Sequence, residues 1–341
     1  MQKHNVLAFL VLPTTTLAQW TYVQSGTRAE LRGLSAVGDG VVWASGARGT
    51  FARSVDGGRT WVADTVPGAA TLDFRAVHAL NDGAAFLASA GEAEKGLAKI
   101  VATGDGGRHW KLSYATAQKG VFLDAIAFWD AKNGIALSDP VDSAFFVLTT
   151  TNGGRSWTRI APERLPKVLP GEAAFAASGS ALALHGKADV WIGTGGGGRA
   201  RVMRSKNRGH TWEVSDTPVH AEGSASGIFS LAFVDDTLGI AVGGDYTKPR
   251  LQARSVALTR DGGRSWSASK APPAAYLSSV AYADGARIVV GVGLAGTFVS
   301  RDSGQSWTQT DTVALNSVRS AGGAVFAVGP GGRIARADSI R

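Results

Sequence analysis

The chain has 341 residues, of which 44% are hydrophobic and 18% charged. It is therefore long enough for one large domain with a sizeable core, and its composition is not that of a disordered chain. The absence of cysteine excludes disulfides, thiolate metal sites, a cysteine nucleophile and a lipid-modified cysteine. The net charge of +8 comes from basic residues spread along the chain, so the basic stripe of a nucleic-acid-binding protein is not predicted.

The N-terminal segment has the pattern of a secretory signal peptide. A short polar start precedes an apolar run from Val6 to Leu12, and small residues then lead to a cleavage site after Ala18. The apolar run is much shorter than the roughly 20 residues that a transmembrane helix needs. A buried first strand is the alternative. We predict a signal peptide over 1–18, a single domain over 19–341, and a periplasmic or secreted protein without a lipobox.

One short motif occurs six times and dominates the expected fold. It reads Ser or Thr, any residue, Asp or Asn, any residue, Gly, two further residues and Trp, with successive tryptophans 41 to 55 residues apart. The acid or amide can accept hydrogen bonds from its own turn, the glycine allows a positive φ, and the tryptophan can fill space beside the next repeat. We predict structural roles in hairpin turns for these residues: Asp56, Asp105, Asn152, Asn207, Asp261, Asp302, Trp61, Trp110, Trp157, Trp212, Trp266 and Trp307.

The runs around each motif predict four strands per repeat. Two strand-like runs precede each motif, such as LRGLSAV and GVVWASG in the first unit, and a polar run such as WKLSYAT follows a tryptophan. One sheet per repeat suits the observed spacing. The C-terminal segment LNSVRSAGGAVFAVGPGGRIARAD has three strand-like runs but no motif, whereas QWTYVQ near the N-terminus resembles an isolated outer strand. We predict an all-β, seven-bladed β-propeller, in which six blades carry the motif and a composite blade joins the chain ends. Six blades are the alternative if the ends do not pair.

These motifs resemble those of the photosystem II stability/assembly-factor-like propellers. That family is related to the bacterial neuraminidase (Asp-box, or BNR) repeat proteins and to sortilin-type propellers, and the resemblance covers roughly 19–338. It implies an exported propeller that binds a protein or assists assembly, and the basic composition is compatible with the arginine-rich surface attributed to such members. The Asp box also occurs in sialidases and some glycoside hydrolases, so it identifies the fold better than the function.

Unequal loops indicate where a binding surface lies. In a propeller, the connections between blades and the loops between second and third strands lie on one face, and loops on a rigid scaffold commonly carry function. In units two to five the loops between the second and third strands are long. Two connections between units, over 159–178 and 214–227, are also long. Neutral variation in loop length is the alternative. Candidate residues on this face are Glu92, Asp139, Asp142, Glu172, Asp245, Tyr246, Lys248 and Arg250.

A second set of candidates lies near the start of the innermost strands. Aligning the repeats places these residues at comparable positions, facing the axial channel on the same side: Arg32, Arg75, Asp124, Ser278 and Asn316. An arginine pair near a carboxylate can hold an anionic group. A buried structural network of the same residues is an equally good interpretation.

An enzyme remains the alternative to a binding protein. A sialidase needs an arginine triad and a Tyr–Glu pair, but the chain has five tyrosines, and Arg319 is two positions out of register with Arg32 and Arg75. The F/Y-R-I-P signature of sialidases is also absent near the N-terminus. Other glycoside hydrolases need two carboxylates at a set separation, for which the candidates are Asp124, Asp139, Glu172 and Asp245.

The leading prediction is an exported, non-catalytic and monomeric propeller. It binds a protein partner, or assists complex assembly, through the loop-bearing face over blades two to five. The alternative is a sialidase-like or other glycoside hydrolase, or a glycan-binding propeller, that uses an acidic axial pocket. The histidines lack metal-ligand spacing, and no phosphate or dinucleotide loop has its required context. We therefore expect no metal, no cofactor, no membrane-spanning segment and no nucleic-acid partner.

Overall fold

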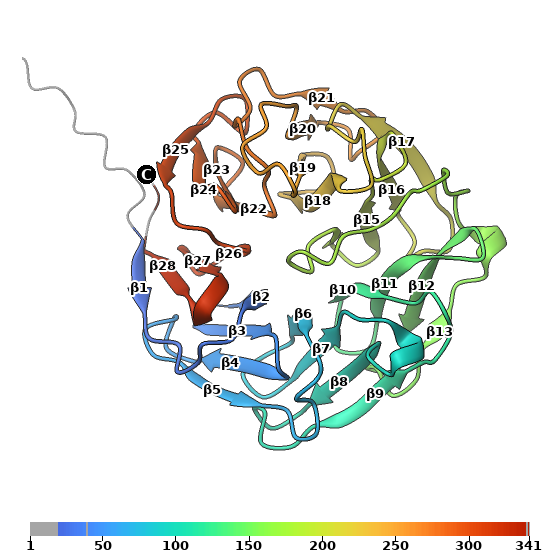
Figure 1. Ribbon diagram of the computed structural model, residues 1–341, viewed down its shortest axis with the longest axis vertical. Helices are drawn as coiled ribbons and strands as arrows, with labels where there is room; N and C mark the ends of the chain where they lie inside the picture. Colours follow the sequence, from blue (N-terminus) through green and yellow to red (C-terminus); the bar gives the residue numbers. More distant parts are fainter. Residues whose placement is uncertain (1–19, 39, 339, 341) are drawn as a thin grey trace, which may run out of the picture.

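The computed structural model describes residues 20–38, 40–338 and 340. Within them, 28 strands form seven four-stranded antiparallel sheets, which are arranged as blades around a central axis (Figure 1). The described residues contain no α-helix and three short 3-10 turns, η1 (Ala93–Lys95), η2 (Pro162–Arg164) and η3 (Pro330–Gly332). The predicted seven-bladed β-propeller is confirmed, and the six-bladed alternative is wrong. The predicted signal peptide over 1–18 lies outside the described residues.

Six blades are each built from four consecutive strands, with the first at the axis and the fourth at the rim (Figure 1). The first three blades are β2 (Leu31–Val37), β3 (Val41–Gly46), β4 (Thr50–Ser54) and β5 (Val62–Thr65); β6 (Phe74–Ala79), β7 (Ala85–Ser89), β8 (Lys99–Thr103) and β9 (Lys111–Ala115); and β10 (Leu123–Phe128), β11 (Gly134–Val141), β12 (Ala144–Thr150) and β13 (Thr158–Arg159). The next three are β14 (Leu182–His185), β15 (Asp189–Gly193), β16 (Ala200–Ser205) and β17 (Glu213–Thr217); β18 (Ser226–Phe233), β19 (Gly239–Asp245), β20 (Val256–Thr259) and β21 (Ser267–Ala268); and β22 (Ser279–Asp284), β23 (Ile288–Gly293), β24 (Gly296–Ser300) and β25 (Thr308–Asp311).

The seventh blade joins the two ends of the chain, as the sequence predicts. Its strands from the axis outward are β26 (Ser317–Ala321), β27 (Ala324–Val328), β28 (Ile334–Ala337) and β1 (Thr21–Val23). Strand β1 pairs antiparallel with β28, with Tyr22 opposite Ala335. The N-terminal strand therefore covers the edge of β28, which would otherwise present unpaired backbone groups to solvent.

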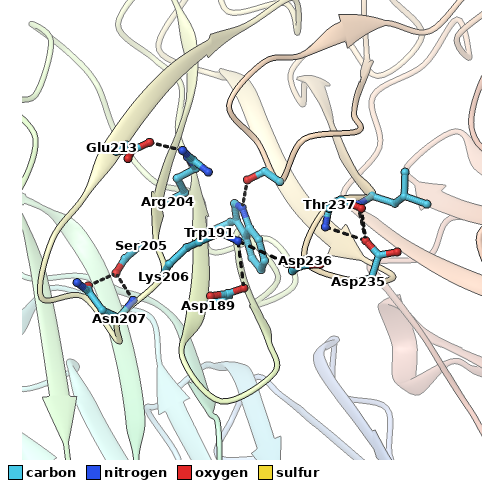
Figure 2. A network of polar contacts seen from close by, with 12 residues as sticks. Asp189, Trp191, Arg204, Ser205, Lys206, Asn207, Glu213, Asp235, Asp236 and Thr237 are labelled. Atoms are coloured by element: carbon cyan, nitrogen blue, oxygen red, sulfur yellow. Dashed lines mark hydrogen bonds and ion pairs between the residues drawn. The ribbon is translucent and has the colours of Figure 1, made fainter.

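The repeated motif closes the hairpin between the third and fourth strands of a blade. In the fourth blade, the Ser205 hydroxyl donates to Asn207 Oδ1 at 2.9 Å (Figure 2). It also accepts the N–H of Gly209 at 2.9 Å. Asn207 Oδ1 also accepts the N–H of Thr211 at 2.9 Å. Gly209 has a φ of 81°, and a Cβ there would lie 2.9 Å from Ile160. The motif thus needs its glycine for both backbone conformation and space.

Apolar side chains fill the spaces between neighbouring blades. Trp191 of β15 is fully buried, stacks on Phe233 with 3.7 Å between ring centroids, and donates its indole N–H to the Gly262 carbonyl at 2.8 Å (Figure 2). Gly262 belongs to the hairpin motif of the next blade, so packing and hydrogen bonding both join adjacent sheets. Aromatic rings bury large apolar areas at such contacts.

The chain direction gives the ring two distinct faces. All seven inner strands run the same way along the axis, because each blade is an antiparallel meander entered at its inner strand. The loop face is the end at which the inner strands begin, and it carries the connections between blades, including the long connection 160–181. The box face is the opposite end, which carries the repeated hairpin motif.

A candidate binding site at the loop face

A cavity of about 300 Å³ lies at the loop-face end of the axial channel. That volume is at the lower end of the range for small-ligand pockets, so it suits one or two side chains of a partner. The starts of several inner strands and the long connection 160–181 form its walls. The cavity brings together all five of the aligned axial residues and two of the candidate rim residues: Arg32, Arg75, Asp124, Ser278 and Asn316, with Asp139 and Tyr246.

One wall of the cavity is aromatic. Phe175 and Phe229 stack with their ring centroids 4.0 Å apart, and Tyr276 meets Phe229 edge-on at 4.7 Å. Tyr246 lies at the mouth with 48% of its surface exposed, and its ring centroid is 6.1 Å from that of Phe229. Burial raises the pKa of Tyr276, so its hydroxyl stays protonated at neutral pH. The wall offers rigid apolar area with the protonated phenol group of Tyr276.

Tyr246 is the only residue of this wall that was predicted from the sequence as a site residue. Phe229 and Tyr276 are buried residues near the starts of inner strands and look like ordinary core aromatics in sequence. Phe175 lies in the long connection, in the run AAFAAS. A single aromatic residue among small residues was the one sequence feature that could have indicated a site residue there. Its contact with Phe229 depends on how that connection folds back over the channel.

Two arginines at the cavity are each paired with an acid two residues earlier. The Nη2 group of Arg32 donates to Glu30 at 2.5 Å, and the Nε group of Arg75 donates to Asp73 at 2.7 Å. Arg32 also donates from Nη1 to the Ala177 carbonyl at 3.4 Å. Both Nη groups of Arg75 are without a hydrogen-bond partner in the described part of the chain. The cavity thus has guanidinium N–H groups available to a ligand.

Two carboxyl groups with raised pKa values face the same cavity. Burial and the neighbouring Asp139 raise the pKa of Asp124 well above its usual range, and its Oδ2 atom is buried without a hydrogen-bond partner. Burial raises the pKa of Asp139 to about 6, while its Oδ1 accepts the N–H of Ala174 at 3.0 Å. Burial therefore disfavours the charged form of both carboxyl groups.

Glu172 lies nearby but is fully engaged by other groups. Its Oε1 accepts hydrogen bonds from Thr194 at 2.6 Å and from Nε of Arg201 at 2.9 Å. Its Oε2 accepts from the N–H of Leu169 at 2.8 Å and from Nη2 of Arg201. Both charged side chains are buried. This ion pair holds the connection 160–181 against the fourth blade and leaves little capacity for a ligand.

Other predicted rim residues lie apart from this cavity. Asp245 and Lys248 line a second cavity of about 720 Å³, together with Arg254. Asp245 accepts from the N–H and hydroxyl of Thr247 at 2.9 and 2.6 Å. The remaining rim candidates, Glu92, Asp142 and Arg250, are exposed on loops. Glu92 forms an ion pair with Lys95 at 2.8 Å. The loop face therefore has two hollows rather than one continuous site.

Arg319 lies at the other end of the channel. It lines a cavity at the box face together with His78, whereas Arg32 and Arg75 line the loop-face cavity. The three arginines therefore do not converge on one ligand position, as a sialidase-like triad would require.

Within the described residues, no helix has the length and apolar character needed to cross a membrane. In the same part of the chain, no group of three or more His, Cys, Asp or Glu side chains is placed to hold a metal ion.

Comparison with known proteins gives a fold but no family. No family model matches the chain, and no curated protein matches its sequence. Among solved structures, it is similar to YCF48 bound to D1 peptide, with a TM-score of 0.65 and 16% identity over 96% of this chain and 99% of that chain. It is also similar to YCF48 from Cyanidioschyzon merolae, with a TM-score of 0.63 and 15% identity over 93% and 98%. The WD40 propeller domain of Doa1 gives a TM-score of 0.58 and 13% identity over 94% and 95%. What the chain shares with these proteins is the propeller fold over nearly its whole length.

Proposed function

We propose that this protein is an exported, non-catalytic propeller that binds a protein partner, or assists in assembling a complex, through its loop face. The cavity of about 300 Å³ is the centre of the contact. The observation that carries the proposal is the pairing of an aromatic wall with guanidinium groups across one cavity on a rigid ring. Aromatic and arginine side chains are the residues that most often dominate binding energy at protein interfaces. Export rests on the signal-peptide pattern over 1–18.

The rim around the cavity is ordered before a partner arrives. Backbone bridges join Ala173 to Gly195 and Gly195 to Gly227, which links the loops of the fourth and fifth blades. The Glu172–Arg201 ion pair holds the connection 160–181 against the fourth blade. A rim that is already ordered loses less conformational entropy on binding. The similarity in fold to YCF48, which has been solved bound to D1 peptide, supports a peptide segment as the ligand.

The test is peptide selection followed by affinity measurement. Peptides selected from a random library on the immobilised protein are titrated against the wild type, Tyr246→Ala and Arg75→Gln. We expect each substitution to weaken binding by about tenfold or more, because each removes a side chain at the cavity. The matched controls are Leu112→Ala, an exposed residue of an outer strand, and Arg155→Gln, an exposed residue of a hairpin motif on the box face. Equal affinities for all variants contradict the proposal.

The alternative is a glycan-directed hydrolase that uses Asp124 and Asp139. The supporting observation is that two carboxyl groups with raised pKa values line the same cavity, since a pair of carboxyl groups can serve as acid and base. Against it, Asp124 is 1% exposed and Asp139 already accepts a backbone hydrogen bond. A glycoside substrate screen tests it: hydrolysis that is lost in both Asp124→Asn and Asp139→Asn supports the enzyme, and no hydrolysis leaves the binding proposal.

A further inference from the structure

A second axial cavity, of about 410 Å³, lies at the box face of the ring. All seven inner strands contribute to its walls. The end of the long connection, over 177–181, lies between this cavity and the one at the loop face. There, Ser178 donates to the Ser278 carbonyl at 2.8 Å, Ser180 donates to Ser230 at 2.8 Å, and Gly179 packs against Ala76. The two cavities share no lining residue.

Arg319 places a positive charge in this cavity without an acidic partner. Its Nη1 group donates to the carbonyl of Val318 at 2.8 Å and to the hydroxyl of Ser279 at 3.3 Å. Its Nε and Nη2 groups have no hydrogen-bond partner in the described chain. No Asp or Glu is among the residues that line the cavity, and Arg319 forms no ion pair within 20–38, 40–338 and 340. Burial lowers the pKa of Arg319 to about 10, which leaves it charged at neutral pH.

His78 lies close to this charge. Burial and the positive charge of Arg319 lower the pKa of His78 to about 4. Its ring packs beside Phe128, with 5.6 Å between the centroids, and neither ring nitrogen has a hydrogen-bond partner in the described chain. An anion beside the two side chains favours the protonated form of His78. Tyr282 is the other titratable side chain that lines the cavity, and Asp235 and Arg260 lie near it.

Arg319 is half-buried, and no acid in the described chain balances its charge. Any small anion that accepts the free N–H groups stabilises the folded state by binding to it. Oxyanions match the forked geometry of a guanidinium and form charge-assisted hydrogen bonds with it. The cavity has room for such an ion, and the Ser320 hydroxyl on its wall offers a further donor.

We propose that the box-face cavity is a binding site for a small oxyanion, held chiefly by Arg319. The ion accepts hydrogen bonds from Nε and Nη2 of the guanidinium, and His78 supplies a second donor when it is protonated. The apolar side chains around the pair, among them Leu34, Leu184 and Phe233, leave space for the body of a small organic phosphate or carboxylate. This site is independent of the proposed peptide contact on the loop face.

The test is calorimetric titration of the full chain with inorganic phosphate, sulfate or acetate in chloride buffer of matched ionic strength. We expect saturable binding of at least one oxyanion with one site per chain. Binding of phosphate but not acetate points to a phosphate-bearing ligand, and the reverse points to an organic acid; either supports the site. No binding of any oxyanion above the chloride control overturns the proposal.

Substitutions then locate the bound ion. Arg319→Gln should weaken binding by about tenfold or more, and Arg319→Lys, which keeps the charge but loses the fork, should weaken it less. Circular dichroism checks that each variant is folded. If Arg319→Gln does not fold, the weaker binding of Arg319→Lys still tests the proposal. Arg199→Gln, which removes an exposed charge far from the cavity, should bind as the wild type does. Loss of binding in Arg75→Gln with full binding in Arg319→Gln assigns the ion to the loop face and overturns the proposal.

Discussion

The two ends of the axial channel place arginine side chains in opposite electrostatic settings. At the loop face, Arg32 pairs with Glu30 and Arg75 pairs with Asp73. At the box face, Arg319 has no acidic partner in the described chain and faces a cavity without carboxylates. A paired guanidinium offers its remaining N–H groups with its charge partly balanced, which suits the polar groups of a peptide. An unpaired one needs an anion, and this difference separates the two proposed sites.

The contrast has a simple origin in the sequence. Glu30 and Asp73 stand two residues before their arginines, directly before β2 and β6, where the strand pairing is irregular. Each acid pairs with its arginine there. Two residues before Arg319 stands Ser317, whose buried hydroxyl has no hydrogen-bond partner in the described chain. The acid that precedes each loop-face arginine is therefore absent at Arg319.

The largest effect expected in this comparison is at the most deeply buried ion pair of the loop face. Glu172→Gln removes the charge partner of Arg201 while keeping the shape of the side chain. We expect the free energy of unfolding to fall by about 3 to 5 kcal/mol, because the arginine is left buried and uncompensated. Urea denaturation measures it. Glu163→Gln, an exposed position in the same connection, should change stability little. A loss below about 1 kcal/mol for Glu172→Gln shows that this pair does not hold the rim.

A smaller effect, which depends on pH, is expected at Asp139. Its pKa is raised from 3.8 to about 6, so the folded state disfavours its charged form. Its contribution to stability is fully present below about pH 4 and is lost as the pH rises through about 6. Asp139→Asn can still accept the Ala174 N–H and has no charge to bury. We expect the variant to be more stable than the wild type by about 1 to 3 kcal/mol near pH 8 and equally stable near pH 4.

Thermal and urea unfolding across that pH range measure the difference at Asp139. The matched control is Asp142→Asn, the same substitution at the exposed tip of the same hairpin. A variant of Asp139 that loses stability at every pH shows instead that the ionised carboxylate is needed to hold the connection 160–181.

Arg319 should respond to substitution with the opposite sign from Glu172. In a buffer without oxyanions, Arg319→Met removes an unbalanced charge and fills the same space with an apolar side chain. We expect the free energy of unfolding to rise by about 1 to 2 kcal/mol, since the transfer of the charge from water no longer has to be offset. Added phosphate should stabilise the wild type and leave the variant unchanged. A large loss of stability without phosphate contradicts the view that Arg319 lacks a partner.

The fold could be predicted because its information is local and repeated. Each hairpin motif specifies a turn by short-range hydrogen bonds, and the spacing of the tryptophans specifies one sheet per repeat. The composite blade could also be predicted, since QWTYVQ supplies the strand that the C-terminal segment lacks. Its pairing follows from the need to cover a sheet edge.

The site could be predicted only where the repeats impose a register. Arg32, Arg75 and Asp124 occupy equivalent positions on inner strands and do line one cavity. The aromatic wall and the engagement of Glu172 depend on the connection 160–181, which has no counterpart in the other repeats. Adjacent loop residues also face different hollows: Tyr246 lines the axial cavity, whereas Asp245 lines the second one. Sequence spacing alone does not fix such directions in a loop.

The smallest expected effect on stability concerns the Arg75–Asp73 pair, and it tests whether that arginine is free to bind. Both side chains are partly exposed, so Arg75→Gln and Asp73→Asn should each cost about 0.2 to 1 kcal/mol, with a coupling energy of similar size in a double-mutant cycle. Arg75→Gln should nevertheless weaken the binding of selected peptides by about tenfold. A coupling energy above about 2 kcal/mol with unchanged peptide binding identifies the pair as a structural network, and the contrast between the two ends of the channel then disappears.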